Sequence, residues 1–89
     1  METETLIEDK VVESQVDEHN LIVYNDDFNT FDHVIESLVK ICEHDSFQAE
    51  QCTMLVHYKG KCDVKSGDFE TLASMCTGLL DRGLSAEVC

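Results

Sequence analysis

The chain contains no proline, few cations and no long apolar run. Only 6 of its 89 residues are lysine or arginine against 19 aspartates and glutamates, so the formal net charge is −13. This excess of negative charge argues strongly against a phosphate backbone as partner and favours cationic or basic partners. No apolar stretch approaches the about 20 residues that a bilayer-spanning helix needs. We therefore expect neither nucleic acid nor a membrane as partner.

The five cysteines are odd in number and form no C-x-x-C pair. The start, Met-Glu-Thr-Glu-Thr, is acidic where a secretory signal is basic. Neither feature supports a disulfide framework, and together they favour a cytoplasmic protein with ordinary buried thiols. The spacing of Cys52, His57 and Cys62 is conceivable for a zinc site, but it is far weaker evidence for a metal site than a C-x-x-C pair. No metal and no cofactor are predicted.

The first twenty residues differ in composition from the rest of the chain. They hold seven acidic residues and one lysine, with no aromatic residue, glycine or proline. Low hydrophobicity combined with high net charge is typical of disordered segments. The sequence therefore predicts a disordered acidic extension over residues 1–19, which a partner can grip, and one small folded domain over residues 20–89.

From residue 20 onward the apolar spacing predicts regular elements. Residues 21–24 are expected to form a buried strand. Apolar residues at i, i+3, i+4 and i+7 predict three helices, over residues 31–42, over 45–60 and from 66 to 83. Short strands are expected over 61–65 and 84–88. Because proline is absent, caps and glycines set the boundaries, and the candidates are Asn29 or Thr30, Asp45, Gly60, Ser66 and Gly83.

The predicted order is β-α-α-β-α-β, which belongs to the α+β class. Three helices packed on one face of a small three-stranded antiparallel sheet form such a sandwich.

The most informative polar feature is Asn25-Asp26-Asp27, between the first strand and the first helix. If the first two helices form a short-looped antiparallel pair, His57 at the end of the second lies beside this cluster. Val34 and Val56 then supply an apolar floor. A few polar groups over an apolar pocket are typical of a selective ligand site. Two acids, an amide and a histidine suit a small cationic group better than bond-breaking chemistry.

Simpler interpretations exist for the same residues. The two aspartates can be no more than turn and cap residues. A histidine at the end of a helix interacts favourably with the helix dipole without any ligand. The other three histidines, His19, His33 and His44, are expected at the surface.

The chain contains two motifs in sequence: Asn25-Asp26-Asp27-Phe28 followed by Val34-Ile35, and then Val56-His57-Tyr58-Lys59-Gly60-Lys61. At this separation and in this order, they resemble the ClpS family, the adaptor of the ATP-dependent Clp protease. The family's pattern is an apolar strand, N-D-D, an aromatic or similar residue and T-P-M-x-F-V, followed later by V-H-x-x-G-K. Its fold is a β-α-α-β-α-β core behind a disordered N-terminal extension. The resemblance covers residues 20–88.

The resemblance implies an adaptor, not an enzyme. Such an adaptor binds N-degrons, proteins whose free first residue is Leu, Phe, Tyr or Trp, and delivers them to an AAA+ unfoldase, ClpA or ClpC. It implies that Asn25, Asp26 and His57 bind the α-ammonium group. The pocket for the first side chain maps onto Phe31, Val34, Thr53, Val56 and Leu84.

The chain departs from the family's pattern at three places. Asn29-Thr30 replaces Thr-Pro, so the rigid turn is lost. Phe31 replaces the usual methionine at the pocket gate, and Thr53 replaces a second methionine, which makes that wall smaller and more polar. Asn29, Thr30 and Asp27 are candidate contacts to the ligand's backbone. The order of preference among the four first residues does not follow from the sequence.

Two rival classes fit less well. A hydrolase built on His57 and Asp26 needs a nucleophile, but no serine or cysteine lies in a recognisable elbow or glycine-rich loop. A plain interaction domain is the alternative, because the same element order resembles the C-terminal domain of the ribosomal stalk protein. Such stalk domains are typically lysine-rich on their factor-binding face and lack the N-D-D/His pair.

Overall fold

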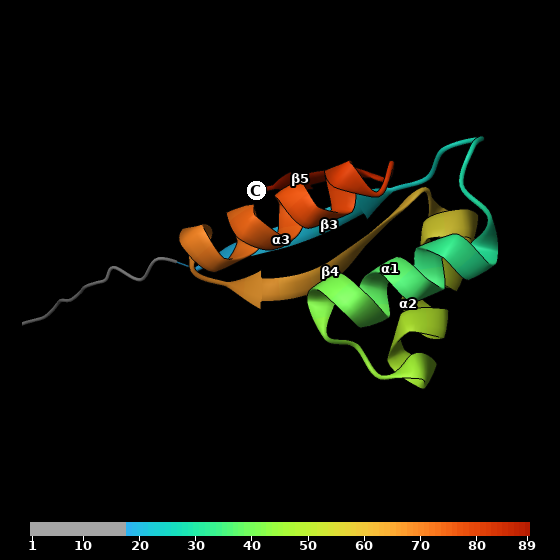
Figure 1. Cartoon of the computed structure of the whole chain (residues 1–89), viewed down its shortest axis with the longest axis horizontal. Helices are drawn as coiled ribbons and strands as arrows, with labels where there is room; N and C mark the ends of the chain where they lie inside the picture. The colour runs from blue at the N-terminus through green and yellow to red at the C-terminus, as the bar shows by residue number, and fades with distance from the viewer. Residues whose placement is uncertain (1–17) are drawn as a thin grey trace, which may run out of the picture.

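The computed structural model describes residues 18–89, and Figure 1 shows their arrangement. The elements follow in the order β3 (His19–Tyr24), α1 (Phe31–Cys42), α2 (Ser46–Lys59), β4 (Lys61–Gly67), α3 (Phe69–Asp81) and β5 (Ser85–Val88). The predicted α+β class and the order β-α-α-β-α-β are confirmed. The predicted acidic extension lies outside the described residues up to residue 17, and His19 is already part of β3.

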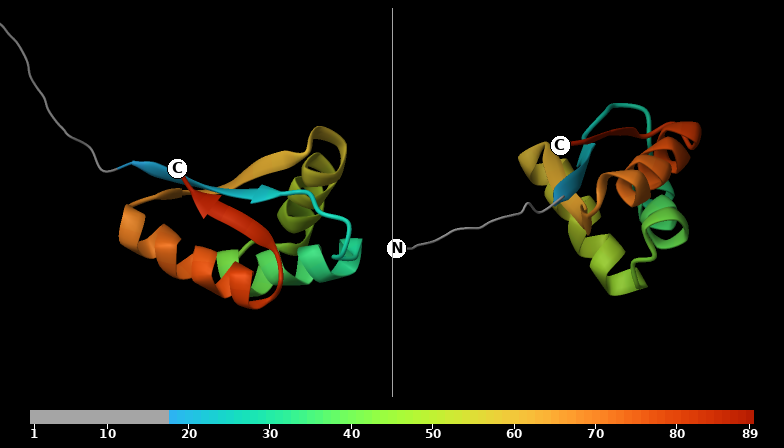
Figure 2. Two further views of the ribbon diagram at one scale, coloured as in Figure 1. Left: turned by 90° about the horizontal axis from the view of Figure 1, so that it is seen from above. Right: turned by 90° about the vertical axis from the view of Figure 1, so that its left-hand side faces the viewer.

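The sheet has three strands in the order β4-β3-β5, and both neighbouring pairs are antiparallel. Figure 2 shows all three helices on one face of this sheet. The register of β3 with β4 shifts between Leu21 and Ile22, which marks a bulge. Asn20 and Cys89 exchange backbone hydrogen bonds of 2.9 and 2.8 Å, so the end of the chain lies beside the start of β3.

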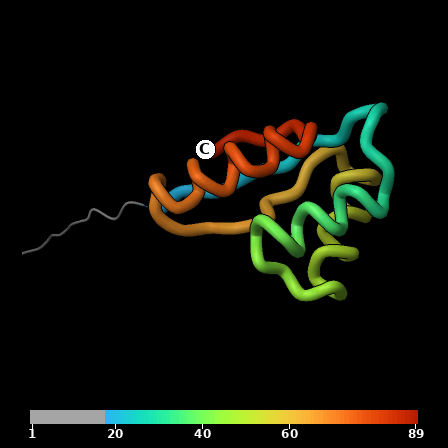
Figure 3. The backbone as a smooth tube through the Cα atoms, in the orientation of Figure 1, coloured from blue at the N-terminus to red at the C-terminus, as the bar shows by residue number. Residues whose placement is uncertain are grey.

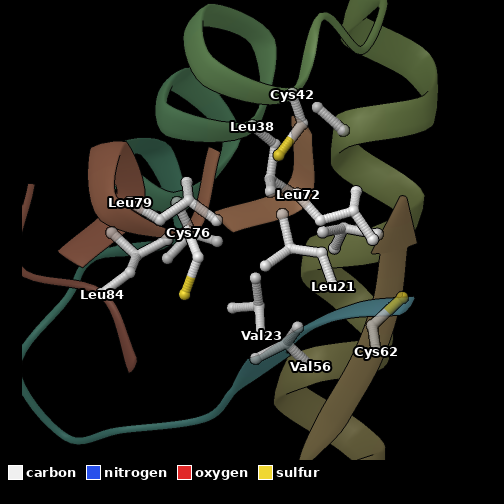
Figure 4. Close-up of a cluster of buried hydrophobic side chains, with 13 residues drawn as sticks. Leu21, Val23, Leu38, Cys42, Val56, Cys62, Leu72, Cys76, Leu79 and Leu84 are labelled. Atoms are coloured by element: carbon white, nitrogen blue, oxygen red, sulfur yellow. The ribbon is translucent and has the colours of Figure 1, made fainter. Parts of the chain in front are cut away.

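The hydrophobic core lies between the sheet and the helices (Figure 4). Leu21 and Val23 point to the same face of β3 and belong to the core, and Ile22 between them is also buried, with 9% of the residue exposed. Leu38, Leu72 and Leu79 of the helices are fully buried against them. Burying each leucine stabilises the fold by about 1.5–3 kcal/mol relative to leaving it exposed.

Capping side chains begin the first two helices as predicted. Thr30 accepts a hydrogen bond from the His33 amide (3.1 Å), and Asp45 accepts one from the Gln48 amide (2.7 Å). Gly60, with φ of 91°, ends α2 in the left-handed conformation that glycine adopts without steric penalty.

The predicted cap of the third helix was wrong. Ser66 pairs with Asn20 within the β3–β4 ladder, so β4 continues to Gly67. Asp68 caps α3 instead, and its carboxylate accepts hydrogen bonds from the Thr71 amide (3.0 Å) and hydroxyl (2.8 Å). A carboxylate at this position also interacts favourably with the positive end of the helix dipole.

The prediction that His44 lies at the surface was also wrong, because only 4% of this residue is exposed. Glu43 ends α1 in a left-handed conformation (φ 62°), and His44 follows it beneath the sheet edge. Its Nε2 lies 2.7 Å from the Val64 carbonyl oxygen of β4. The histidine therefore belongs to the packing between the α1–α2 connection and the sheet.

Phe31 of α1 and Phe69 and Leu80 of α3 are exposed apolar residues, at 40%, 49% and 51%. Each lies in the first or last turn of its helix. No helix within residues 18–89 is long and apolar enough to cross a bilayer.

Candidate functional site

The end of α2 returns to the start of α1, as expected from the short connection between the two helices (Figure 3). The rings of Phe31 and His57 lie edge to face with their centroids 6.0 Å apart. Loop 25–30, which follows β3, joins this junction. The predicted polar cluster and His57 are therefore brought together by tertiary structure.

A cavity of about 200 Å³ opens at the junction. Its lining combines a polar rim with an apolar floor and consists of Asn25, Asp26, Asp27, Asn29, Phe31, Val34, Thr53, Val56 and His57. The structure thus gathers most of the predicted site residues around one hollow. Their contacts with a ligand remain predictions.

Two predicted site residues do not line this cavity. Thr30 is the N-cap of α1, where its hydroxyl oxygen accepts the His33 amide hydrogen. Leu84 is 4% exposed and belongs to the hydrophobic core (Figure 4). Both side chains thus have structural roles.

The Asp26 carboxylate is held by hydrogen bonds from its own loop. Its Oδ1 accepts from the backbone amides of Phe28 and Asn29, each at 2.8 Å, and its Oδ2 accepts from Asn29 Nδ2 at 2.7 Å. Burial acts to raise the pKa of Asp26, but these donors outweigh it and hold the pKa below its usual value. The carboxylate is therefore ionised and fixed in orientation at neutral pH.

Asn29 links the loop to a distant part of the chain. Besides donating to Asp26, its Nδ2 donates to the carbonyl oxygen of Gly83 at 2.9 Å. His33 of α1 makes a second link, with its Nε2 2.8 Å from the Arg82 carbonyl oxygen. These contacts tie the site loop and the start of α1 to the end of α3.

This link was not predictable from the sequence. Asn29 and Gly83 are separated by 54 positions, so no spacing rule relates them. The only local signal was the departure at Asn29-Thr30 from the Thr-Pro pattern, which marked the position as unusual without naming its partner.

The opposite wall of the cavity belongs to α2. Thr53 is 2% exposed, and its hydroxyl donates to the Ala49 carbonyl oxygen within the same helix at 2.7 Å. Its donor capacity is therefore satisfied inside the helix. At the rim, the backbone amide of Asn25 donates to the Gly60 carbonyl oxygen at 2.9 Å, which joins the end of β3 to the turn after His57.

The lining of the cavity favours binding over nucleophilic catalysis. No serine or cysteine occurs among the nine residues that line it, and the one hydroxyl there, on Thr53, is already bonded to its helix. Across residues 18–89, no group of three or more His, Cys, Asp or Glu side chains is placed to hold a metal ion, so Cys52, His57 and Cys62 do not form such a group. The site offers oxygen and nitrogen acceptors around an apolar hollow.

Comparisons with known proteins agree with this geometry. The model of the family described as ATP-dependent Clp protease adaptor protein ClpS matches residues 14–87. The ATP-dependent Clp protease adapter protein ClpS of Thermosynechococcus vestitus is 41% identical over 68 residues, which span 75% of this chain and 72% of that protein.

A solved structure, that of Agrobacterium tumefaciens ClpS2 bound to L-phenylalaninamide, has a similar fold. It superimposes with a TM-score of 0.80 over 84% of this chain and 98% of its own, at 15% sequence identity. At that identity the likeness concerns the fold alone.

Proposed function

Because this chain belongs to the ClpS family of adaptor proteins of the ATP-dependent Clp protease, we propose that its cavity binds the free first residue of a substrate protein when that residue is Leu, Phe, Tyr or Trp. The adaptor then delivers the substrate to an AAA+ unfoldase, ClpA or ClpC, in the cytoplasm. The family is one of adaptors rather than of proteases, and the ribosomal-stalk-like alternative loses its support.

The observation that carries the proposal is the pairing of a fixed carboxylate with an apolar hollow. A carboxylate offers about four lone-pair positions, and the loop donors of Asp26 occupy three of them. The remaining position on Oδ2 accepts one hydrogen of an α-ammonium group. The Asn25 side-chain oxygen and a neutral nitrogen of His57 accept the other two.

The volume and the floor suit one apolar side chain. The cavity of about 200 Å³ is smaller than the roughly 300–1,000 Å³ of pockets for drug-sized ligands. Val34 and Val56 are 8% and 4% exposed and form part of its lining, whereas Phe31, 40% exposed, stands where the family's gate residue maps. A single residue, with its amino group at the rim and its side chain inside, fits these dimensions.

The ligand of the Agrobacterium tumefaciens relative has matching chemistry. L-Phenylalaninamide carries a free α-ammonium group, an aromatic side chain and an amide in place of the carboxylate. It therefore resembles the first residue of a protein chain. The similar fold supports the same class of ligand for the cavity described here.

The expected affinity is weak to moderate. Each charge-assisted hydrogen bond contributes about 1.5–3 kcal/mol net, and burying a leucine or phenylalanine side chain contributes about 1.5–3 kcal/mol. Loss of translational and rotational freedom on association offsets several kcal/mol of this sum. Such a ligand is released readily, which an adaptor requires.

Fluorescence polarisation with labelled peptides tests the proposal. A peptide beginning with Phe should bind, and the same peptide with an acetylated amino group should bind about 100-fold more weakly, because at least two charge-assisted bonds are lost. Equal affinity for the two peptides would contradict recognition of the α-ammonium group.

Matched variants locate the site. His57→Ala and Asp26→Asn should each weaken binding of the Phe peptide by about 10- to 100-fold, because each removes one ammonium contact. Asp32→Asn makes the same chemical change at an exposed position of α1 that does not line the cavity, and it serves as the control with an expected loss under about threefold. Circular dichroism confirms that each variant is folded. Full binding by both site variants would place the ligand elsewhere.

Delivery is tested separately from binding. A folded reporter that begins with Phe should be degraded by a reconstituted Clp protease faster with the full-length chain than without it, with ClpA or with ClpC as the unfoldase. The His57→Ala variant should remove that acceleration. If the peptide binds but neither unfoldase responds, the delivery part of the proposal is wrong while the binding part stands.

A further inference from the structure

We propose that a bound substrate continues from the ligand cavity along the outer seam between α1 and α2, and that its third to fifth residues are recognised there when they combine apolar side chains with a cation. The inference rests on the proposed function, because it assigns a second contact to the same ligand. The observations that carry it come from a separate part of the surface.

A second hollow, of about 390 Å³, opens between α1 and α2, which lie against each other (Figure 3). It is lined by Ile35 of α1 and by Ser46, Phe47 and Glu50 of α2. Phe47 is 69% exposed, and Ile35 is only partly buried. Apolar side chains gathered around a hollow mark a contact surface, whereas single exposed ones do not.

Helical spacing connects this second hollow to the ligand cavity. On α1, Phe31 lines the cavity and Ile35, four residues later on the same face, lines the hollow. On α2, His57 lines the cavity and Glu50, seven residues earlier and two turns away on one face, lines the hollow. The cavity and the second hollow therefore follow each other along the same seam of the helix pair.

The distance between the two openings suits a short stretch of extended chain. One turn of α1 and two turns of α2 advance about 5 and 11 Å along the helix axes. An extended chain advances about 3.3 Å per residue. With the first residue in the cavity, the third to fifth residues lie about 7–13 Å further on, so they reach the second hollow.

The lining of the second hollow defines the chemistry of those residues. Ile35 and Phe47 offer apolar surface to a side chain such as leucine, and Glu50 adds a carboxylate. Both ion pairs within residues 18–89 belong to Glu36, so no cation from that part of the chain neutralises Glu50. A lysine or arginine next to the apolar residue is attracted by this carboxylate, whereas an aspartate or glutamate is repelled.

Charge argues against the two occupants that the chain itself could supply. A second copy carries the same formal net charge of −13. The first twenty residues hold seven acidic residues and one lysine. Either occupant would bring further carboxylates to a surface that already presents Glu50. A substrate segment of the opposite charge is the better match.

Fluorescence polarisation with labelled peptides of equal length tests the inference. All peptides begin Phe-Ser; one continues Leu-Arg-Leu at the third to fifth positions, a second Ser-Gly-Ser and a third Leu-Glu-Leu. The full-length chain should bind the Leu-Arg-Leu peptide about tenfold more tightly than the Ser-Gly-Ser peptide, because apolar contact and an ion pair are added. Reversing the charge in the Leu-Glu-Leu peptide should weaken binding about threefold relative to Leu-Arg-Leu.

Matched variants assign these preferences to the second hollow. Phe47→Ala should reduce the tenfold preference for Leu-Arg-Leu over Ser-Gly-Ser to about twofold. Glu50→Gln should make the Leu-Arg-Leu and Leu-Glu-Leu peptides bind alike at low salt. Phe69→Ala and Glu70→Gln make the same changes at exposed positions of α3 and should keep both preferences. Circular dichroism confirms that each variant is folded.

The outcomes separate this inference from the proposed function. If acetylation of the amino group weakens every peptide but the three sequences bind equally, the cavity stands and the second contact is overturned. A preference that survives Phe47→Ala overturns it as well. If acetylation has no effect, the proposed function and the inference fail together. A second copy in the hollow would appear in sedimentation velocity as a dimer that Phe47→Ala dissociates, and that result would also overturn the proposal.

Discussion

The two ends of α1 are held in the fold by opposite means. At its start, side-chain hydrogen bonds near the surface join loop 25–30 and His33 to the end of α3, through the carbonyls of Gly83 and Arg82. At its end, the connection over residues 43–45 carries His44 into a buried contact with Val64 of β4. The start of α1 is thus held by polar hydrogen bonds near the surface, whereas the connection after its end packs into the core.

This difference bears on the polar-rimmed cavity at the start of α1. The second hollow, of about 390 Å³, is lined by Ile35 of α1 and by Ser46, Phe47 and Glu50 of α2. Polar bonds at a surface hold backbone and side chains in place without filling the space between them. Packing into the core removes such space, because protein interiors are as dense as organic crystals. The start of α1 therefore keeps a hollow that a ligand can fill.

The largest effect is expected from a pair of histidine variants. His44→Ala leaves the buried Val64 carbonyl without its side-chain partner and creates a cavity, which should lower the free energy of unfolding by about 2–3 kcal/mol. His33→Ala removes a bond of similar length to a carbonyl, but at a half-buried position that water reaches, so about 1 kcal/mol is expected. Urea unfolding measures both, and equal losses would contradict the contrast between the two ends.

Asn29 provides the second test, at the polar end. Asn29→Ala removes the donors to Asp26 and to the Gly83 carbonyl and should lower stability by about 1 kcal/mol. The affinity for a Phe-initial peptide should fall about tenfold if the loop positions the proposed ligand.

Asn29→Asp sharpens that test. It keeps the shape of the side chain but sets a second carboxylate against Asp26, so it should destabilise more than alanine at neutral pH. Acidification should recover part of the loss, because one carboxyl of the pair takes up a proton. If alanine and aspartate behave alike at every pH, Asn29 does not support Asp26 in the way described.

The pH dependence of stability tests the Asp26 turn. Burial acts to raise the pKa of Asp26, but the loop hydrogen bonds lower it below the ordinary value of 3.8. A lowered pKa in the folded state stabilises the fold above the unfolded value, and this contribution is lost as the pH falls through the folded value. The unfolding free energies of the wild type and Asp26→Asn should therefore differ near neutrality and converge below pH 3.8. A constant difference across the titration would contradict this account.

The smallest effect is expected at the surface bridge between α1 and α3. Glu36 lies 3.2 Å from both Lys40 and Arg82, and the hydrogen bond with Lys40, followed by the charges of both cations, lowers the pKa of Glu36. Glu36→Gln should lower the melting temperature slightly at low salt. At about 1 M salt the wild type and the variant should melt together, because exposed charges are then screened. A difference that persists in high salt would mean that Glu36 acts through packing.

Local features of the fold were predictable where a residue acts on its own backbone or on backbone groups only a few positions away. Thr30 and Asp45 cap helices through amides three positions away, and Gly60 ends α2 through its own backbone conformation. Ser66 failed as a cap because pairing with Asn20, a long-range contact, continued the strand. His44 failed as a surface residue because its partner is 20 positions further along the chain.

The site divides in the same way. The N-D-D motif and His57 were recognisable as local patterns, and the order of the helices indicated that they meet. The use of three lone-pair positions of Asp26 by its own loop, and the bond between Asn29 and Gly83, were not predictable. Both depend on side-chain orientations that only the packed chain defines.

Periodicity, caps and motifs are local properties of the chain, so they predicted the α+β order, the polar cluster at the end of the first strand, and the resemblance to the ClpS family. The bond from Asn29 to the Gly83 carbonyl and the burial of His44, by contrast, depend on how the chain packs. These are contacts between residues far apart or on different elements, and packing density and hydrogen-bond satisfaction, rather than local propensity, select among the alternatives.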